Sequence, residues 1–382
     1  MLLIEADGKA LFKVAGIRIP DGFVVVKGAA APAIAGPGPW VVKAQLPVGG
    51  RGKAGGVIRC ENEAAVRAAL KQLLGARIKG HEVLSCRVET AVSSTDEYYL
   101  SLMIDPVHYG VRVALLPEGG VDVEHAAPTA AERIRLCDLD EHAIVAAIRD
   151  LASEESVDRQ AAIVDVGEKL TRLFVTRELI LAEINPLFFD QATCVAGDAK
   201  VVVDLNAVHR QPEIAQLIEL NVPVYPDAHR KLHDGFDYVE IDPEGEIGLV
   251  TTGAGLSMML IDKLIARGGR PLNFCDIRTG QFRGDPKRLM RVLEWISARP
   301  SVRILLINIF AGITDLSEFA DLLCTALERT PSLQVPVVAR LVGNRVEQAR
   351  SILAARRPDI AVEEALDAAL EHVDVVLRGA RA

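Results

Sequence analysis

The sequence predicts two domains, a mixed α+β domain followed by a doubly wound α/β domain with a parallel sheet. A chain of 382 residues is long enough for two hydrophobic cores. Its first half carries mostly strand-like runs with a few helical segments, whereas its second half alternates buried-type strands with helical patterns. The proline-punctuated segment 221–246 lies between the two patterns. We therefore expect a first domain over residues 1–222 and a second over residues 223–382.

Helices, strands and a hairpin are expected in the first domain. Asn62 is a typical helix N-cap, and the apolar stripe that follows it ends at Gly75. A second helical pattern covers residues 159–173. A turn separates two further apolar runs, which predicts the two arms of a β-hairpin. The strand-like runs are 83–89, 98–104 and 111–116, and the hairpin arms are 179–189 and 195–205.

The second domain alternates strands and helices. Such alternation predicts parallel strands joined by right-handed helical crossovers. The expected strands are 247–251, 271–275, 304–310 and 335–341, and the expected helices are 256–266, 287–297, 316–327 and 346–354.

The composition excludes several classes of protein. With 43 basic and 52 acidic residues the net charge is −9, which argues against a general affinity for nucleic acid or anionic membranes. The longest apolar run, Ile304–Ile313, is about half of the ~20 residues that a membrane span needs. Glu5 and Asp7 stand where a signal peptide would carry basic residues, and the six cysteines are scattered without zinc-site spacing. We expect a cytoplasmic protein.

A glycine-rich stretch, KAQLPVGGRGKAGGV at residues 43–57, carries five glycines and three basic residues. Gly50–Gly55 matches the G-x-G-x-x-G fingerprint, but a strand-like run follows it instead of the required helix. No Gly-Lys-Ser/Thr closes the stretch as in a P-loop. We interpret it as a flap between two strands that binds a triphosphate through Arg51 and Lys53, with Lys43 on the strand beneath. A surface turn with solvated basic residues is the alternative.

The hairpin arms carry the segments Glu183-Ile-Asn-Pro-Leu187 and Gly197-Asp-Ala-Lys200. Asn185 and Asp198 are therefore expected to face each other. An amide oxygen and a carboxylate suit Mg²⁺, which takes few protein ligands and keeps phosphate and water oxygens. Asn and Asp side chains that merely cap turns are the alternative. Together with the glycine-rich flap, the hairpin predicts a site for a magnesium-bound nucleotide.

Six segments, in chain order, resemble the β subunit of ADP-forming succinate–CoA ligase over nearly the whole chain: KAQLPVGGRGKAGGV, AEINPL, DAK, TGAGLSM, NIFAGI and VPVVARLVGN. The resemblance implies an ATP-grasp domain followed by a flavodoxin-like CoA-ligase domain. It implies that Asn185 and Asp198 hold magnesium and that Glu183 steadies a phosphohistidine. Pro20 favours ATP over GTP. The implied nucleotide contacts are Lys43, Gly50, Arg51, Gly52, Glu89 and Glu97.

The resemblance also implies a partner. In that family the phosphoryl group passes from ATP to a histidine of the α subunit, which binds CoA, and then reversibly to the acid. None of the eight histidines of this chain sits in a glycine-rich loop that would expose a nucleophile. We therefore expect an α partner that supplies the histidine and the CoA site. A nucleotide-sensing paralogue without turnover, and an ATP-grasp ligase that joins an acyl phosphate to an amine, are the alternatives.

The acid is expected to bind where strands of the second domain end. By the resemblance, Gly312, Ile313 and Thr314 border the substrate at the subunit interface. Several positions depart from the succinate-specific pattern. Thr252 stands in place of asparagine and Ala311 in place of the first glycine of NIFGGI. A run of three glycines is replaced by Arg278-Thr-Gly280, and Arg-Cys-Asp by Asp315-Leu-Ser317.

These departures suggest an acid other than succinate, larger, hydroxylated or more highly charged, such as malate or citrate. Arg278 adds a planar donor fork that suits a carboxylate. Its alternative roles are a solvated side chain or an ion pair with Glu240 or Asp276. A dinucleotide site at Gly253-x-Gly255 is a further alternative, with Asp276 as the acidic residue, although Met258 replaces the third glycine.

Overall fold

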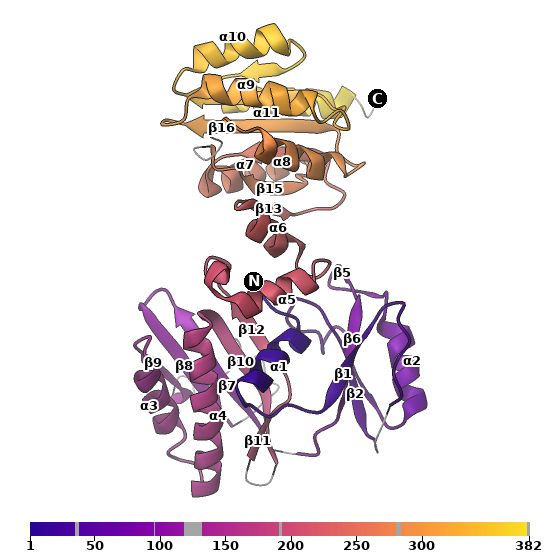
Figure 1. Ribbon diagram of the computed structural model, residues 1–382, viewed down its shortest axis with the longest axis vertical. Coiled ribbons are helices and arrows are strands. Elements are labelled where there is room, and N and C mark those ends of the chain that lie inside the picture. The colour runs from indigo at the N-terminus through magenta and orange to yellow at the C-terminus, as the bar shows by residue number, and fades with distance from the viewer. Residues whose placement is uncertain (35–37, 95, 118–131, 191–192, 280–283, 380–382) are drawn as a thin grey trace. The chain divides into compact units, whose positions relative to one another are not determined.

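The computed structural model describes the chain except residues 35–37, 95, 118–131, 191–192, 280–283 and 380–382 (Figure 1). The chain divides into two compact units, Met1–Val224 and Tyr225–Ala382, called the N-terminal and C-terminal units below. Gly280 of the expected substrate loop lies outside the described residues. Among the residues that are described, no helix is both long and apolar enough to cross a bilayer.

A four-stranded antiparallel sheet forms the first layer of the N-terminal unit. As predicted, helix α2 (Glu63–Leu73) starts at Asn62, whose side chain accepts a hydrogen bond from the Ala65 N–H at 2.9 Å. The apolar stripe of α2 is buried against the sheet. In spatial order the strands are β1 (Gly22–Val26), β6 (Ser85–Thr90), β2 (Trp40–Ala44) and β3 (Val57–Cys60). A short ribbon of β4 (Arg77–Ile78) and β5 (His81–Glu82) is separate from it.

A second, larger antiparallel sheet completes the N-terminal unit. Its order is β11-β10-β7-β8-β9, and β12 also pairs with β10. The strands are β7 (Glu97–Asp105), β8 (Gly110–Leu116), β9 (Ile134–Cys137), β10 (Leu179–Asp190), β11 (Thr193–Ala196) and β12 (Lys200–Val203). The helices that accompany it are α1 (Glu5–Val14), α3 (Glu141–Leu151), α4 (Val157–Thr176) and α5 (Pro212–Leu220), with a short 3₁₀ helix at Val208–Arg210.

The predicted hairpin is confirmed, with one interruption. β11 and β12 both run antiparallel to β10. Glu183 lies opposite Lys200 and Leu187 lies opposite Ala196, so the ladder is broken between these pairs. There the Gly197 N–H donates to the Pro186 carbonyl at 2.8 Å. Asn185 and Asp198 therefore both lie in the break, on opposite arms.

The C-terminal unit contains a six-stranded sheet that is parallel except for one edge. In spatial order the strands are β13 (Asp237–Glu240), β15 (Asn273–Asp276), β14 (Ile247–Thr251), β16 (Ile304–Ala311), β17 (Val337–Gly343) and β18 (Ala361–Glu363). β13 is antiparallel to β15, and this edge strand was not predicted. The remaining pairs are parallel, as the sequence predicts.

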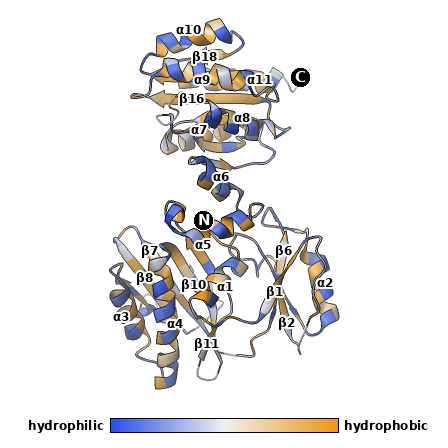
Figure 2. Cartoon of the chain, viewed as in Figure 1, coloured by the Kyte–Doolittle hydropathy of each residue, from blue (hydrophilic) through white to orange (hydrophobic). Residues whose placement is uncertain are grey.

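Helices cover both faces of this sheet. Alternate residues of β16 belong to different cores, because Leu306 lies in one hydrophobic cluster and Ile307 in the other. In Figure 2, β16 is mostly hydrophobic, whereas the covering helix α10 carries both colours. Helices α7 (Ala254–Ala266) and α11 (Leu366–Gly379) share one cluster, and α8 (Lys287–Ser297), α9 (Leu316–Glu328) and α10 (Val346–Arg356) share the other. The predicted doubly wound arrangement is confirmed.

Candidate active site

The glycine-rich loop joins β2 to β3, as predicted, and its arginine turns inward. Gly50 and Gly52 are exposed, whereas Arg51 between them is buried. The Arg51 guanidinium donates from Nη1 to the Ala44 carbonyl at 2.9 Å, which folds the loop back over its own strand. Gly50 has φ +69°, a left-handed conformation that glycine adopts without strain. The loop is therefore not a turn in which every basic side chain is solvated.

Lys43 lies on β2 beneath the loop, and its side chain is only 11% exposed. Its ammonium nitrogen lies 2.8 Å from Glu5 Oε1, 2.7 Å from Glu89 Oε1 and 2.6 Å from the Gly197 carbonyl oxygen. An ammonium group has three protons. The three oxygens around Lys43 are therefore enough to accept all of them.

A second lysine, Lys9 of α1, is fully buried beside Lys43. Its Nζ lies 2.7 Å from Glu5 Oε1, 2.9 and 2.7 Å from the two Glu89 oxygens, and 2.8 Å from the Gly197 carbonyl. Arg87 of β6 donates from Nε to Glu89 at 2.7 Å. The lysines thus share two carboxylates and one carbonyl. We call Glu5, Lys9, Lys43, Arg51, Arg87, Glu89 and Asp198 the ion cluster; it contains four cationic and three anionic side chains.

Arg51 connects the ion cluster to the hairpin. Its Nη2 lies 2.9 Å from Glu5 Oε2, and 3.1 and 3.2 Å from the two Asp198 oxygens. The Asp198 side chain is 35% exposed, whereas the Glu5 side chain is completely buried. The cluster therefore extends from a buried carboxylate on α1 to a carboxylate that solvent reaches, and it joins both sheets of the N-terminal unit.

The charges of the cluster shift one another. Burial alone would raise the pKa of Glu5, but Lys43, Lys9 and Arg51 outweigh it and hold that pKa well below its usual value. Desolvation, together with the nearby Glu5 carboxylate, raises the pKa of Asp198 despite Arg51. Glu5, Glu89 and Asp198 raise the pKa of Lys43 against the opposing influence of burial. Glu5 is thus ionised, and among the neighbouring charges it acts most strongly to raise the pKa of Lys9, Lys43 and Arg51.

The residues expected to hold Mg²⁺ are an amide and a carboxylate in the break of the hairpin ladder. Asp198 reaches solvent there, and its oxygens contact Arg51 and the Ala199 N–H at 2.7 Å. Asn185 is half-buried on the other arm. Both side chains offer hard oxygen ligands, so the donor set fits magnesium.

Glu183, the expected catalytic carboxylate, lies on β10 next to this break. Its Oε2 accepts from the Tyr99 hydroxyl at 3.2 Å and from the Lys200 ammonium at 3.3 Å. The side chain keeps 14% of its surface exposed. It is therefore held on two sides and still accessible.

The two remaining expected nucleotide contacts lie on different sheets. Glu89 belongs to β6 and is buried in the ion cluster, where it contacts both Lys9 and Lys43. Glu97 begins β7, lies opposite Phe188 of β10, and is half-buried. Their roles toward a nucleotide stay predictions.

The residues expected to bind the acid lie at the carboxyl ends of the parallel strands in the C-terminal unit. Arg278 donates to Asp237 Oδ2 at 2.9 Å, rather than pairing its side chain with Glu240 or Asp276 as considered above. Thr252, directly after β14, accepts from the Phe310 N–H at 3.3 Å and is nearly buried. The two strand ends β14 and β16 are thus joined through Thr252.

The loop after β16 is the most exposed apolar part of this edge. Ile313 is 99% exposed, and Phe310 is also exposed, so two large apolar side chains face solvent. Gly312 between them is exposed, and the Thr314 and Thr279 hydroxyl oxygens lie 3.0 Å apart. This contact joins the Gly312–Thr314 loop to the Arg278 loop.

The acidic residue of the dinucleotide alternative has a structural role at this edge. Asp276 Oδ1 accepts from the Gly253 N–H at 3.0 Å and from the Arg278 N–H at 3.3 Å. It thereby fixes the turns after β14 and β15.

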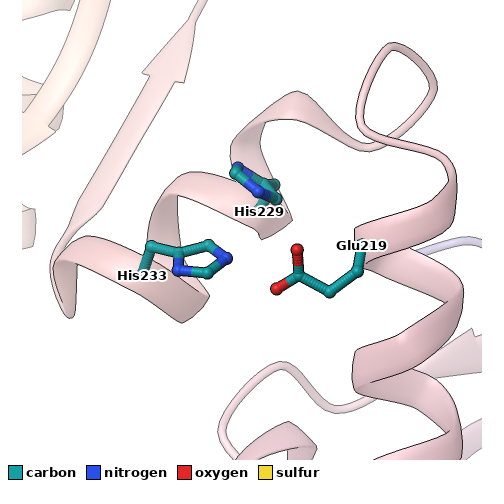
Figure 3. A group of neighbouring side chains, drawn as sticks. All are labelled: Glu219, His229 and His233. Carbon is teal, nitrogen blue, oxygen red and sulfur yellow. The ribbon is translucent and has the colours of Figure 1, made fainter.

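Two histidines of the C-terminal unit lie next to each other. His229 and His233 lie one turn apart on α6 (Pro226–Asp234), with ring centroids 4.3 Å apart (Figure 3). Both therefore lie on a helix rather than in a glycine-rich loop.

Sequence reasoning missed the buried half of the site. Glu5 was read only as part of the N-terminal segment, Lys200 was noted only as part of a hairpin arm, and Lys9, Arg87 and Tyr99 were not considered. The Glu5–Lys9 spacing of four residues places both on one face of a helix, and this is the one signal that could have indicated a paired role.

Comparisons with known proteins agree on two families along the chain. Residues 2–189 match the ATP-grasp domain family, and residues 250–373 match the CoA-ligase family. The β subunit of ADP-forming succinate–CoA ligase from Chloroflexus aurantiacus is 36% identical over 365 residues, which cover 93% of each chain. The corresponding subunit from Halorhodospira halophila is 34% identical over 393 residues, covering 98% of this chain and 99% of the relative.

A solved structure shares the fold. ATP citrate lyase from Methanothrix soehngenii, in complex with citrate and coenzyme A, superposes with a TM-score of 0.74. The match covers 99% of both chains at 18% sequence identity. At this identity the likeness concerns the fold alone.

Proposed function

This chain belongs to the family of β subunits of ADP-forming succinate–CoA ligase, an acid–thiol ligase family, and we propose that it is the ATP-binding subunit of an ADP-forming carboxylic acid–CoA ligase. In this proposal it binds Mg-ATP and passes the phosphoryl group to a histidine of an α partner. The partner also holds CoA, and the phosphoryl group then reaches a di- or tricarboxylic acid. Acyl-CoA, ADP and phosphate are the products.

One observation carries the proposal, the ion pair between Arg51 and Asp198. A cation of the glycine-rich loop and a candidate metal ligand of the hairpin lie in direct contact, although they are 147 residues apart in sequence. A magnesium-bound triphosphate would need both kinds of group within a few ångströms, because oxygen ligands would hold the metal and the remaining phosphate charge would require a cation. Lys43 and the loop N–H groups add further donors.

In the proposed site, Asn185 and Asp198 would hold magnesium, and the metal would neutralise part of the phosphate charge. Arg51 and Lys43 orient the phosphates, and the exposed backbone of Gly50 and Gly52 lets them approach closely. Glu183 accepts a hydrogen bond from a ring N–H of an incoming imidazole and so fixes its orientation, since a carboxylate next to a histidine determines which ring nitrogen is protonated.

We further propose that the acid is not succinate. Arg278 supports this, because a guanidinium binds a carboxylate in a bidentate manner. Its present partner is a carboxylate, since Nη2 donates to Asp237 Oδ2 at 2.9 Å. Thr252 is a shorter hydrogen-bonding group than the asparagine of the succinate-specific pattern. A site that can no longer form a hydrogen bond to a substrate discriminates strongly against that substrate, here succinate.

The experiment is a label-transfer assay with the complete chain. The chain is co-expressed with a candidate α subunit, and γ-labelled Mg-ATP is added. Acid-labile, alkali-stable label on the partner, absent with Asp198→Ala, is the expected result. A panel of carboxylic acids with CoA then identifies the acid that discharges the label. If ATP binds but no label is transferred with any α partner, the nucleotide-sensing alternative replaces the proposal.

A further inference from the structure

Glu5 is buried at the centre of the cations that the proposed function assigns to phosphate. Its Oε1 lies 2.8 Å from Lys43 Nζ, and its Oε2 lies 2.9 Å from Arg51 Nη2. It thus contacts both side chains that would orient the phosphates. Its own side chain has no exposed surface, so no ligand can reach it without displacing the cations.

The donors of these two cations are largely in use. Lys43 has three oxygen neighbours within 2.8 Å. The Nη2 group of Arg51 contacts Glu5 and Asp198, and its Nη1 group donates to a carbonyl. A phosphate oxygen that binds Lys43 or the Nη2 group of Arg51 must therefore replace an oxygen that the protein itself supplies.

We infer that Glu5 is a positioning residue of the phosphate site, an internal carboxylate that holds Lys43 and Arg51 in place and competes with the nucleotide for them. The inference rests on the proposed function and deepens it. Binding of the nucleotide would then be an exchange: Asp198 would leave Arg51 to hold magnesium, and Lys43 and Arg51 would donate to phosphate oxygens in place of Glu5. The internal carboxylate lowers affinity for the nucleotide and keeps the cations oriented while the site is empty.

The charges support this exchange. The ion cluster contains four cations against three carboxylates, so it is nearly neutral as it stands. Removing the charge of Glu5 leaves four cations against two carboxylates and makes the site more attractive to a polyanion. Glu89 does not serve the same purpose toward Arg51, because its contacts are with Lys9, Lys43 and Arg87.

Glu5→Gln tests the inference, because glutamine keeps the size and one acceptor oxygen of the side chain but loses its charge. Binding of ATP is measured by calorimetry with EDTA present, at low and at high salt. We expect the dissociation constant to fall about tenfold at low salt, with a smaller gain at high salt because exposed and partly exposed charges are screened. Glu178→Gln is the matched control; it removes an ion pair with Arg210 in the same unit and should change nothing.

Tighter binding that depends on salt is a result that a purely structural role would not give. Unchanged or weaker binding by folded Glu5→Gln overturns the inference, whereas absence of Mg-ATP binding by the wild type overturns the proposed function instead. Folding is checked by thermal melting. If Glu5→Gln does not fold, Glu5→Asp replaces it: the charge stays but retracts by one methylene, and a smaller gain in affinity is expected. Equal or weaker binding by Glu5→Asp would then overturn the inference.

Discussion

Arg51 and Asp198 lie in contact across the N-terminal unit, with Nη2 3.1 Å from Oδ1 and 3.2 Å from Oδ2. Arg51 belongs to the loop between β2 and β3 of the smaller sheet, and Asp198 belongs to the hairpin of the larger one. The pair therefore fixes the distance between the proposed phosphate-binding loop and the proposed metal-binding hairpin. Because each partner has a second proposed ligand, the pair must open when Mg-ATP binds.

Asp198→Asn should act in opposite directions on two ligands. It removes a magnesium ligand charge, so the affinity for Mg-ATP should fall at least about tenfold. It also releases Arg51, so the affinity for ATP in EDTA should stay the same or rise. Calorimetric titration of both ligands measures this. A parallel loss for both would indicate that Asp198 only supports the fold.

Arg278→Gly should change the acid preference without affecting nucleotide binding. Arg278 lies in the C-terminal unit and pairs with Asp237, whereas the ion cluster lies in the N-terminal unit. The ratio of kcat/KM values for a panel of acids, with the α partner present, should shift by about tenfold or more toward succinate. Asp237→Asn is the companion variant, since it frees the guanidinium without removing it. An unchanged ratio for Arg278→Gly would contradict the specificity proposal.

Two isoleucines, Ile307 within β16 and Ile313 after its end, should differ in how much their replacement changes stability. Ile307 is completely buried between sheet and helices, so Ile307→Ala should lower the free energy of unfolding by about 2–5 kcal/mol. Ile313 is 99% exposed, and Ile313→Ala should leave the free energy of unfolding nearly unchanged. Urea unfolding followed by circular dichroism compares the two. If Ile313 borders the partner, Ile313→Ala should instead weaken binding of the α subunit.

The cysteines should be poorly reactive in the native protein. Burial raises the pKa of the Cys86, Cys194 and Cys275 thiols to about 12, so at pH 8 about one molecule in 10⁴ carries the reactive thiolate at each. Cys137 is only half-buried, and burial also raises the pKa of its thiol. We expect iodoacetamide to modify Cys137 first and these three only after unfolding, as peptide mass spectrometry can show. Early modification of Cys275 would contradict its burial.

The α/β half of the fold was well predicted from the sequence. β14 begins and ends where predicted, and so does α8, because buried apolar runs and amphipathic helices alternate there with clear breaks. β13 was missed because it has only four residues, of which two are acidic, and it joins the sheet at an edge. A short edge strand carries little periodic signal.

The candidate site was predicted only in its outer half. Lys43, Arg51 and Asp198 were found because glycine-rich and hairpin segments are local patterns. Glu5 and Lys9 were missed because their role depends on α1 packing between the two sheets, and their four-residue spacing does not show which charged residues of other elements surround them. Glu89 was expected as a nucleotide contact by the resemblance, but a strand glutamate does not reveal that two lysines will surround it.

The central claim is that the ion cluster and the hairpin form the site for Mg-ATP, and direct binding tests it. Mg-ATP is titrated into the full chain by calorimetry, with wild type, Arg51→Ala and the control Glu178→Gln. The account predicts that the wild type and the control each bind one nucleotide per chain. The affinity should be lower when EDTA removes magnesium. It should fall at least about tenfold in folded Arg51→Ala. Failure of the folded wild type to bind Mg-ATP, or equal binding by Arg51→Ala, would contradict it.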